Sequence, residues 1–144
     1  MAFDMDKIGI IGGSGMEDPA FINDYSSKTV STPYGDPSSE LVIGNIADVA
    51  VAILSRHGPG HSINPTNVNY RANVWSLKEE GCTHILAVTA CGSLRKRIEP
   101  GHFVFPDQFI DRTTKRINTY FDGSDVQHVS MGEPFSAELR NRVE

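Results

Sequence analysis

The stretch VAVAILSRHGPGHSINPTNVNYRANVWSLKEEGCTHILAVT, residues 49–89, contains the pattern that decides the fold. Apolar runs at Val49–Ser55 and His84–Thr89 each predict a strand. Between them, apolar residues recur at helical spacing after Asn64-Pro65, a pair that suits the first turn of a helix, and Gly81 ends the pattern. A strand, a helix and a strand in this order predict a parallel βαβ unit.

Three further strands are predicted around this unit, because short apolar runs there are separated by turn residues. They span Lys7–Ile11, Lys28–Thr32 and Glu40–Ile46, and a hairpin at Asn45–Asp48 leads from the last of them to the strand at Val49. Such short connections join antiparallel strands, so the predicted fold class is α/β with a mixed, largely parallel sheet flanked by helices.

The C-terminal third has weaker patterns. His102–Phe105 predicts one more strand, and Asp111–Ser124 is polar enough to predict a loop or an outlying ribbon. Ser136 is a suitable N-cap for a helix that begins after it, with Glu138 in the first turn.

Composition excludes several classes of protein. A formal net charge of −5 argues against a non-specific nucleic-acid binder, so no nucleic-acid partner is expected. The apolar runs are only as long as strands, so no membrane association is expected. Cys82 and Cys91 have neither metal-ligand spacing nor a disulfide framework, which predicts no metal site and a reducing, cytosolic setting.

Polar chemistry gathers where three predicted strands end, at the edge where open α/β sheets bind ligands. Gly12-Gly13-Ser14-Gly15 supplies main-chain N–H groups and one hydroxyl. Arg56-His57 adds a guanidinium, which can grip a phosphate through two parallel hydrogen bonds. Thr89–Ser93 ends a strand that is predicted to be buried, and its Cys91 is expected to be a small buried filler rather than a nucleophile.

Each of the three segments alone also has an ordinary structural explanation. The glycines suit a tight turn, Arg56 a surface salt bridge beside a hydrogen-bonded histidine, and Thr89–Ser93 a close-packed strand end. Together they predict a site for an oxyanion, for which phosphate is the simplest candidate.

Four segments of the sequence also match a known family: KIGIIGGSG, SRHGPGHSINPTNVNYRANVWSLKEEGCTHILAVTACGSL, DQFIDRT and MGEPF. They resemble the 5′-methylthioadenosine phosphorylases, a branch of the trimeric purine-nucleoside phosphorylase family. The resemblance extends from Lys7 to the end of the sequence, and residues 56–94 are its most specific part.

The resemblance implies a reaction in methionine and purine salvage. Inorganic phosphate, a co-substrate, attacks the anomeric carbon of 5′-methylthioadenosine and releases adenine and 5-methylthioribose 1-phosphate. No metal and no organic cofactor are implied. A homotrimer is implied, located in the cytoplasm and also in the nucleus.

The resemblance further implies which residues bind phosphate, namely Ser14, Arg56, His57, Thr89 and Ala90. Thr89 would also reach the ribose, and Ala90 would act through its main chain.

A second implied set binds the nucleoside. Cys91 and Gly92 fall where the family's chain passes the purine, and His61 falls near the sugar. His128 matches a histidine that reaches the methylthio pocket of a neighbouring subunit, although it also reads as an exposed loop histidine.

The acid that protonates the leaving purine is not matched, because the family's aspartate falls beyond Glu144 and family chains are about twice as long. We therefore expect residues 1–144 to be the N-terminal part of a single phosphorylase domain, with an incomplete fold and negligible turnover on its own. Two alternatives stay open. The first is a phosphorylase of inosine, guanosine or methylthioinosine in place of methylthioadenosine. The second is a non-catalytic fragment or truncated isoform that pairs with full-length subunits.

Overall fold

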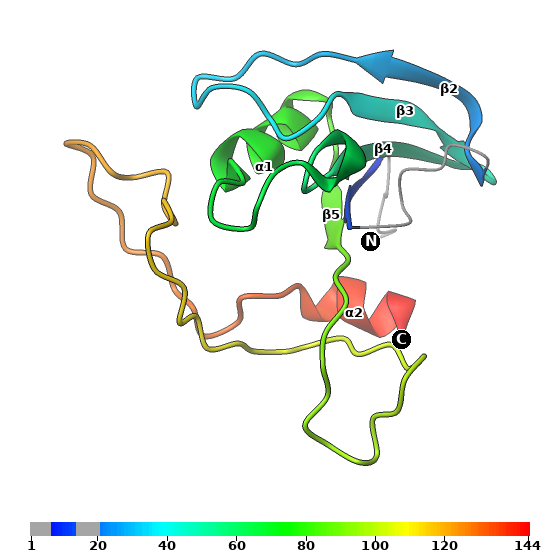
Figure 1. Ribbon diagram of the computed structural model, residues 1–144, viewed down its shortest axis with the longest axis vertical. Helices are drawn as coiled ribbons and strands as arrows, with labels where there is room; N and C mark the ends of the chain where they lie inside the picture. Colours follow the sequence, from blue (N-terminus) through cyan, green and yellow to red (C-terminus); the bar gives the residue numbers. More distant parts are fainter. Residues whose placement is uncertain (1–6, 14–20) are drawn as a thin grey trace. The chain divides into compact units, whose positions relative to one another are not determined.

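The computed structural model describes residues 7–13 and 21–144, which divide into two compact units. The first unit contains the described residues up to Ala90 together with Arg116–Asn118. The second comprises Cys91–Lys115 and Thr119–Glu144, which are irregular except for the helix α2 (Ala137–Val143), drawn in red in Figure 1. No helix within these described ranges is long and apolar enough to cross a membrane.

The first unit is built on a mixed sheet with the strand order β2-β3-β4-β1-β5 (Figure 1). β1 pairs in parallel with both β4 and β5, whereas β3 pairs antiparallel with β2 and with β4. The strands are β1 (Ile8–Gly12), β2 (Asn23–Lys28), β3 (Leu41–Ile46), β4 (Val49–Ser55) and β5 (His84–Ala87). The predicted α/β class, the hairpin between β3 and β4, and the βαβ unit from β4 to β5 are confirmed.

Two apolar clusters hold the sheet, one on each face. Leu77 of the helix α1 (Tyr70–Glu79) packs with Ile11 and Leu54, while Ile10 and Ile53 pack on the opposite face. Successive side chains of a strand point to opposite faces, so a central strand buried on both sides needs an unbroken apolar run. The runs in β1 and β4 have this form, which is why the sequence marked them clearly.

Four of the predicted elements differ from the structure, and one of these is β5, which ends at Ala87 instead of Thr89. The second strand spans Asn23–Lys28 instead of Lys28–Thr32; it is an exposed edge strand, held by its backbone pairing with β3, so no apolar alternation marks it. His102–Phe105 forms no strand and is exposed. A strand requires a partner for its backbone groups, and apolar residues alone do not provide one.

The start of the helix also differs from the prediction. Asn64 accepts hydrogen bonds from the main-chain N–H groups of Thr66 and Asn67 and so caps a turn, whereas α1 begins five residues later than its Pro65 would allow, after Asn69. Asn69 accepts from the N–H of Ala72 and donates to the carbonyl of Tyr34. Both Asn64 and Asn69 can cap a helix, but only Asn69 also bonds to Tyr34, and α1 begins after Asn69.

A buried polar pair fastens the 29–40 connection to α1, and Figure 1 shows this connection (cyan) running alongside the helix. The side chain of Asn73 is 1% exposed. Its Oδ1 accepts from the main-chain N–H of Ser38 at 2.7 Å, and its Nδ2 donates to the Ser38 hydroxyl at 2.9 Å. Both functional groups of the amide are therefore satisfied, as burial requires.

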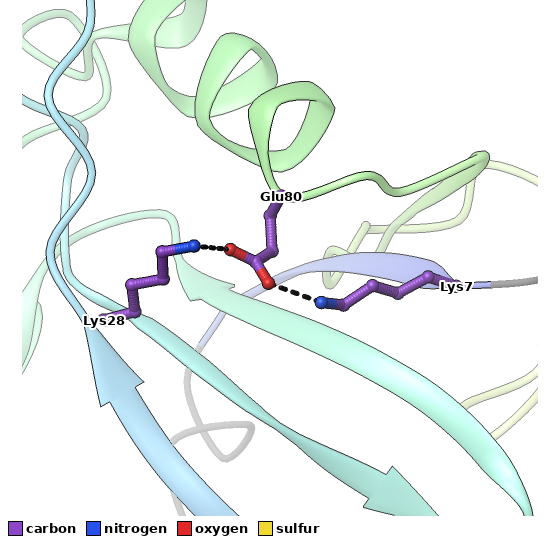
Figure 2. A network of polar contacts seen from close by, with 3 residues as sticks. All are labelled: Lys7, Lys28 and Glu80. Carbon is purple, nitrogen blue, oxygen red and sulfur yellow. Dashed lines mark hydrogen bonds and ion pairs between the residues drawn. The ribbon is translucent and has the colours of Figure 1, made fainter.

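A charged network joins the C-terminal end of α1 to the sheet (Figure 2). The side chain of Glu80 is 9% exposed, and its carboxylate forms two ion pairs. Its Oε1 lies 2.5 Å from Nζ of Lys7, and its Oε2 lies 2.6 Å from Nζ of Lys28. Burial by itself raises the pKa of Glu80, but the hydrogen bonds and charges of the two lysines outweigh burial, and the pKa lies below its ordinary value.

We expect Glu80→Gln to lower the free energy of unfolding near neutral pH by about 1–2 kcal/mol, because two charge-assisted hydrogen bonds are lost at a partly solvated site. A folded-state pKa below the unfolded value of about 4.3 means that this stabilisation is complete above pH 4.3 and disappears as the pH falls through the folded-state pKa. The difference in free energy of unfolding between wild type and variant, measured by denaturant unfolding between pH 3 and 7, should therefore shrink toward the acidic end. Glu79→Gln, at the exposed neighbouring position, is the control, and a difference that persists unchanged at pH 3 would contradict this account.

Candidate functional site

The carboxyl ends of β4, β1 and β5 lie side by side. In the register of the sheet, Ile11 of β1 is opposite Leu54 on one side and Ala87 on the other. The ladder continues past the strands, because the N–H of Arg56 donates to the carbonyl of Gly12 and the N–H of Val88 donates to that of Ile11, both at 2.9 Å. The residues that follow the three strands therefore start from one edge of the sheet.

The guanidinium of Arg56 spans this edge from β4 to β5. Its Nη1 donates to the main-chain carbonyl of Val88 at 3.0 Å, and its Nη2 donates to the hydroxyl of Thr89 at 3.2 Å. Its Nε donates to Nε2 of His57 at 3.2 Å. Among the described residues, three of the five N–H groups of this guanidinium thus have partners, which fixes the plane of the group. Arg56 is half-buried and Thr89 is exposed, so the cation faces a position that a ligand can reach.

Gly13, the residue after β1, allows this close approach. A Cβ atom at Gly13 would lie 3.1 Å from Nη2 of Arg56, which is tighter than most real Cβ contacts. The absence of a side chain therefore leaves the guanidinium beside the main chain of the glycine-rich segment. Ser14, the predicted hydroxyl of this segment, lies outside the described residues.

The loop after β4 folds tightly around His57. Gly58 follows with a φ of 72°, a conformation that favours glycine. A Cβ atom there would also lie only 3.0 Å from the carbonyl oxygen of Ser38, so space favours glycine as well. A short 3-10 turn, Pro59–His61, brings the ring of His61 to 4.4 Å from that of His57, measured between centroids, with a tilt of 31°. His57 is buried and His61 is exposed.

Among the described residues, the side-chain hydrogen bonds of Arg56 involve none of the other predicted site residues. Ala90, one residue beyond Thr89, is exposed, and its main-chain role stays a prediction. Cys91, Gly92 and His128 belong to the second unit, where all three are exposed, and their predicted roles stay predictions. The expectation that Cys91 is a buried filler is wrong, because β5 ends at Ala87 and the chain after it is exposed.

Two participants were missed by sequence reasoning. The carbonyl of Val88 anchors Arg56, and the carbonyl of Ile63 is 2.8 Å from Nδ1 of His57. Every residue has a carbonyl group, so neither position has a side-chain signature. Gly13 did have one, since it lies within the glycine-rich segment that the sequence singled out.

Within residues 7–13 and 21–144, no group of three or more His, Cys, Asp or Glu side chains could hold a metal ion. Burial raises the pKa of the Cys82 thiol, which packs against the apolar cluster beneath α1 and so behaves as a core residue.

Comparison with known proteins places the chain in a family. A model of the phosphorylase superfamily matches residues 7–144. The S-methyl-5′-thioadenosine phosphorylases of Danio rerio and Xenopus tropicalis are 55% and 57% identical over 139 and 140 residues, each match covering 93% of this chain and 50% of the relative. The crystal structure of a point mutant of the adenosine/methylthioadenosine phosphorylase from Schistosoma mansoni in complex with methylthioadenosine has a TM-score of 0.87 at 50% identity, covering 94% of this chain and 49% of that one.

The chain thus spans about half the length of the curated relatives it matches. On the extent of the matched region and the level of identity, the chain belongs to the phosphorylase superfamily and is similar to its S-methyl-5′-thioadenosine phosphorylases.

Proposed function

We propose that the protein catalyses the phosphorolysis of 5′-methylthioadenosine to adenine and 5-methylthioribose 1-phosphate. The observation that carries the proposal is the guanidinium of Arg56 held against Val88 and Thr89 at the shared edge of three neighbouring strands. Similarity to S-methyl-5′-thioadenosine phosphorylases, and to a relative solved with methylthioadenosine, supports the choice of nucleoside.

Phosphate has two tasks in this reaction. Breaking a glycosidic bond builds positive charge on the sugar ring in an oxocarbenium-like transition state. A phosphate dianion held against the anomeric carbon is the nucleophile, and its charge also stabilises that transition state. Holding the two reactants in place contributes about 7–11 kcal/mol where the geometry is ideal.

The donors proposed to hold phosphate suit this balance. Arg56 contributes one permanent charge, Ser14 and Thr89 contribute hydroxyls, and Ala90 contributes a main-chain N–H. One cation with neutral donors orients the dianion without neutralising it fully, so the phosphate remains nucleophilic. The group that protonates the departing purine stays unassigned.

The nucleoside contacts are proposed from the family match. Cys91 and Gly92 would pass the purine, His61 would lie near the sugar, and His128 would enter the methylthio pocket of a neighbouring subunit. This last role requires an oligomer. From the family resemblance we propose a homotrimer, together with the absence of any metal or organic cofactor. A cytoplasmic and nuclear location and a role in methionine and purine salvage are proposed on the same basis.

The test is a product assay on the full-length protein, since negligible turnover is expected of residues 1–144 alone. Purified protein is incubated with 5′-methylthioadenosine with and without inorganic phosphate, and adenine and 5-methylthioribose 1-phosphate are quantified by chromatography. We expect both products, in equal amounts, only when phosphate is present, and no effect of a metal chelator. Inosine and guanosine are run in parallel; faster cleavage of either would favour the 6-oxopurine alternative, and no cleavage of any nucleoside would overturn the proposal.

A further inference from the structure

The imidazole of His57 is fixed in one orientation and one tautomer. Its Nδ1 lies 2.8 Å from the carbonyl oxygen of Ile63, and a carbonyl can only accept a hydrogen bond, so Nδ1 carries a proton. A second hydrogen bond joins the same two residues, because the N–H of Ile63 donates to the main-chain carbonyl of His57 at 2.8 Å. The residue is 9% exposed, and the ring of His61 packs against it.

The second ring nitrogen faces a group that can only donate. Nε2 of His57 lies 3.2 Å from Nε of Arg56, and a guanidinium has no acceptor. Nε2 must therefore present its lone pair, which is the arrangement of the neutral imidazole with the proton on Nδ1. Both hydrogen bonds of the ring are satisfied by this single tautomer, and a protonated Nε2 would oppose a donor.

The contact has a consequence for Arg56. An arginine side chain has several rotatable bonds, and ordering it costs conformational entropy that a ligand would otherwise have to offset. The bond from Nε to His57 fixes the end of the side chain on one side, while Val88 and Thr89 hold its terminal nitrogens. The guanidinium is thus already oriented before an anion arrives.

We propose that His57 is a positioning residue, whose ring acts on phosphate through Arg56 and not as a hydrogen-bond donor to the anion. The inference rests on the proposed function, since it takes phosphate as the ligand of Arg56. It assigns the ring of His57 a part distinct from that of Arg56, although the two residues are adjacent in the sequence and were predicted to bind phosphate together.

Two substitutions at His57 separate the two nitrogens. Glutamine places its amide near the position of Nε2 and keeps an acceptor for Arg56, whereas asparagine places its amide near Nδ1 and keeps only the donor to Ile63. The readout is the Kd for inorganic phosphate, measured by titration calorimetry on the whole protein. We expect His57→Asn to raise this Kd about tenfold, the effect of losing one hydrogen bond to a charged group, and His57→Gln to change it less than about threefold.

A double-mutant cycle then tests whether the ring acts through Arg56. Arg56→Lys keeps a cation, so phosphate binding remains measurable, but it removes the Nε–H group. In this background, we expect His57→Asn to change the Kd by less than about twofold, since the partner of the acceptor is absent. A direct contact between the ring and phosphate would instead give the same tenfold loss in both backgrounds, and that result would overturn the inference.

A measurement on the unmutated protein tests the inference even if the variants fail to fold. The Nε–H proton of Arg56 should exchange with water more slowly in NMR spectra than that of Arg97, an exposed arginine, because it is hydrogen-bonded within the protein. Equal exchange rates would overturn the inference without any substitution. Phosphate binding that shows the expected coupling in a protein without phosphorolysis would support the inference and contradict the proposed function. A protein that binds no phosphate would contradict both.

Discussion

Arg56→Ala is expected to lower kcat/KM for phosphate by about 100- to 1000-fold, the effect of deleting a preorganised charged donor from an anion site. The loss should fall on the KM for phosphate, while the KM for the nucleoside changes little. The reason is geometric: among the described residues the guanidinium contacts Val88, Thr89 and His57 at the strand ends, so its remaining N–H groups are directed by a rigid frame. Steady-state kinetics at varied phosphate and fixed 5′-methylthioadenosine measure the effect.

The matched control for this experiment is Arg142→Ala. Arg142 is an exposed residue of α2 whose contact with Glu138, at 4.0 Å, is a surface pair of small expected value. Wild-type kinetics are expected for the control, because it removes the same charge from a position outside the proposed site. Arg56→Ala that left the phosphate dependence intact, or that acted only on the nucleoside KM, would separate Arg56 from phosphate.

Asn73→Leu is expected to lower the free energy of unfolding by about 2–4 kcal/mol, because each buried polar group left without its partner costs about 1–3 kcal/mol. Leucine has a similar size, so the substitution opens no large cavity. The N–H and hydroxyl of Ser38, which is itself buried, lose the hydrogen bonds that the amide of Asn73 provides. The cost therefore arises from unmet hydrogen bonds and not from a cavity.

Urea unfolding of the protein, followed by circular dichroism, measures this effect. Asn141→Leu makes the same chemical change at an exposed position of α2 and should alter stability by less than about 0.5 kcal/mol. A second variant, Ser38→Ala, removes only the hydroxyl and should cost less than Asn73→Leu, since the main-chain N–H of residue 38 keeps its acceptor. Equal stability of wild type and Asn73→Leu would show that the pair contributes nothing.

Two kinds of element could be predicted from the sequence: strands whose two faces are both covered by apolar residues, and a helix whose N-cap residue bonds to its own first turn. β1, β3 and β4 appear in the sequence as apolar runs, and their observed bounds agree with the prediction to within one residue. The helix α2 follows Ser136, whose hydroxyl accepts from the N–H of Leu139, as the capping pattern predicted. In each case the signal and the structure involve the same few neighbouring residues.

The elements that could not be predicted depend on distant partners. β2 exists because β3 offers its backbone groups to an edge strand of polar residues. The start of α1 at Tyr70 depends on Asn69 reaching Tyr34, which is 35 residues away in the sequence. For the position of β2 and for the start of α1, the local preferences of the residues did not identify the observed choice. Hydrogen bonds to residues distant in the sequence determined it.

The sequence by itself determined the α/β class, the three segments with anion-binding chemistry and the family to which they belong, because residue types and their order are enough for each of these. Only the tertiary structure decided that Arg56 lies against Val88 and Thr89, and that the lone pair of His57 faces Arg56. Those facts depend on strand order and register, which bring together residues more than 30 positions apart, and on backbone carbonyls, which look the same at every position of a sequence.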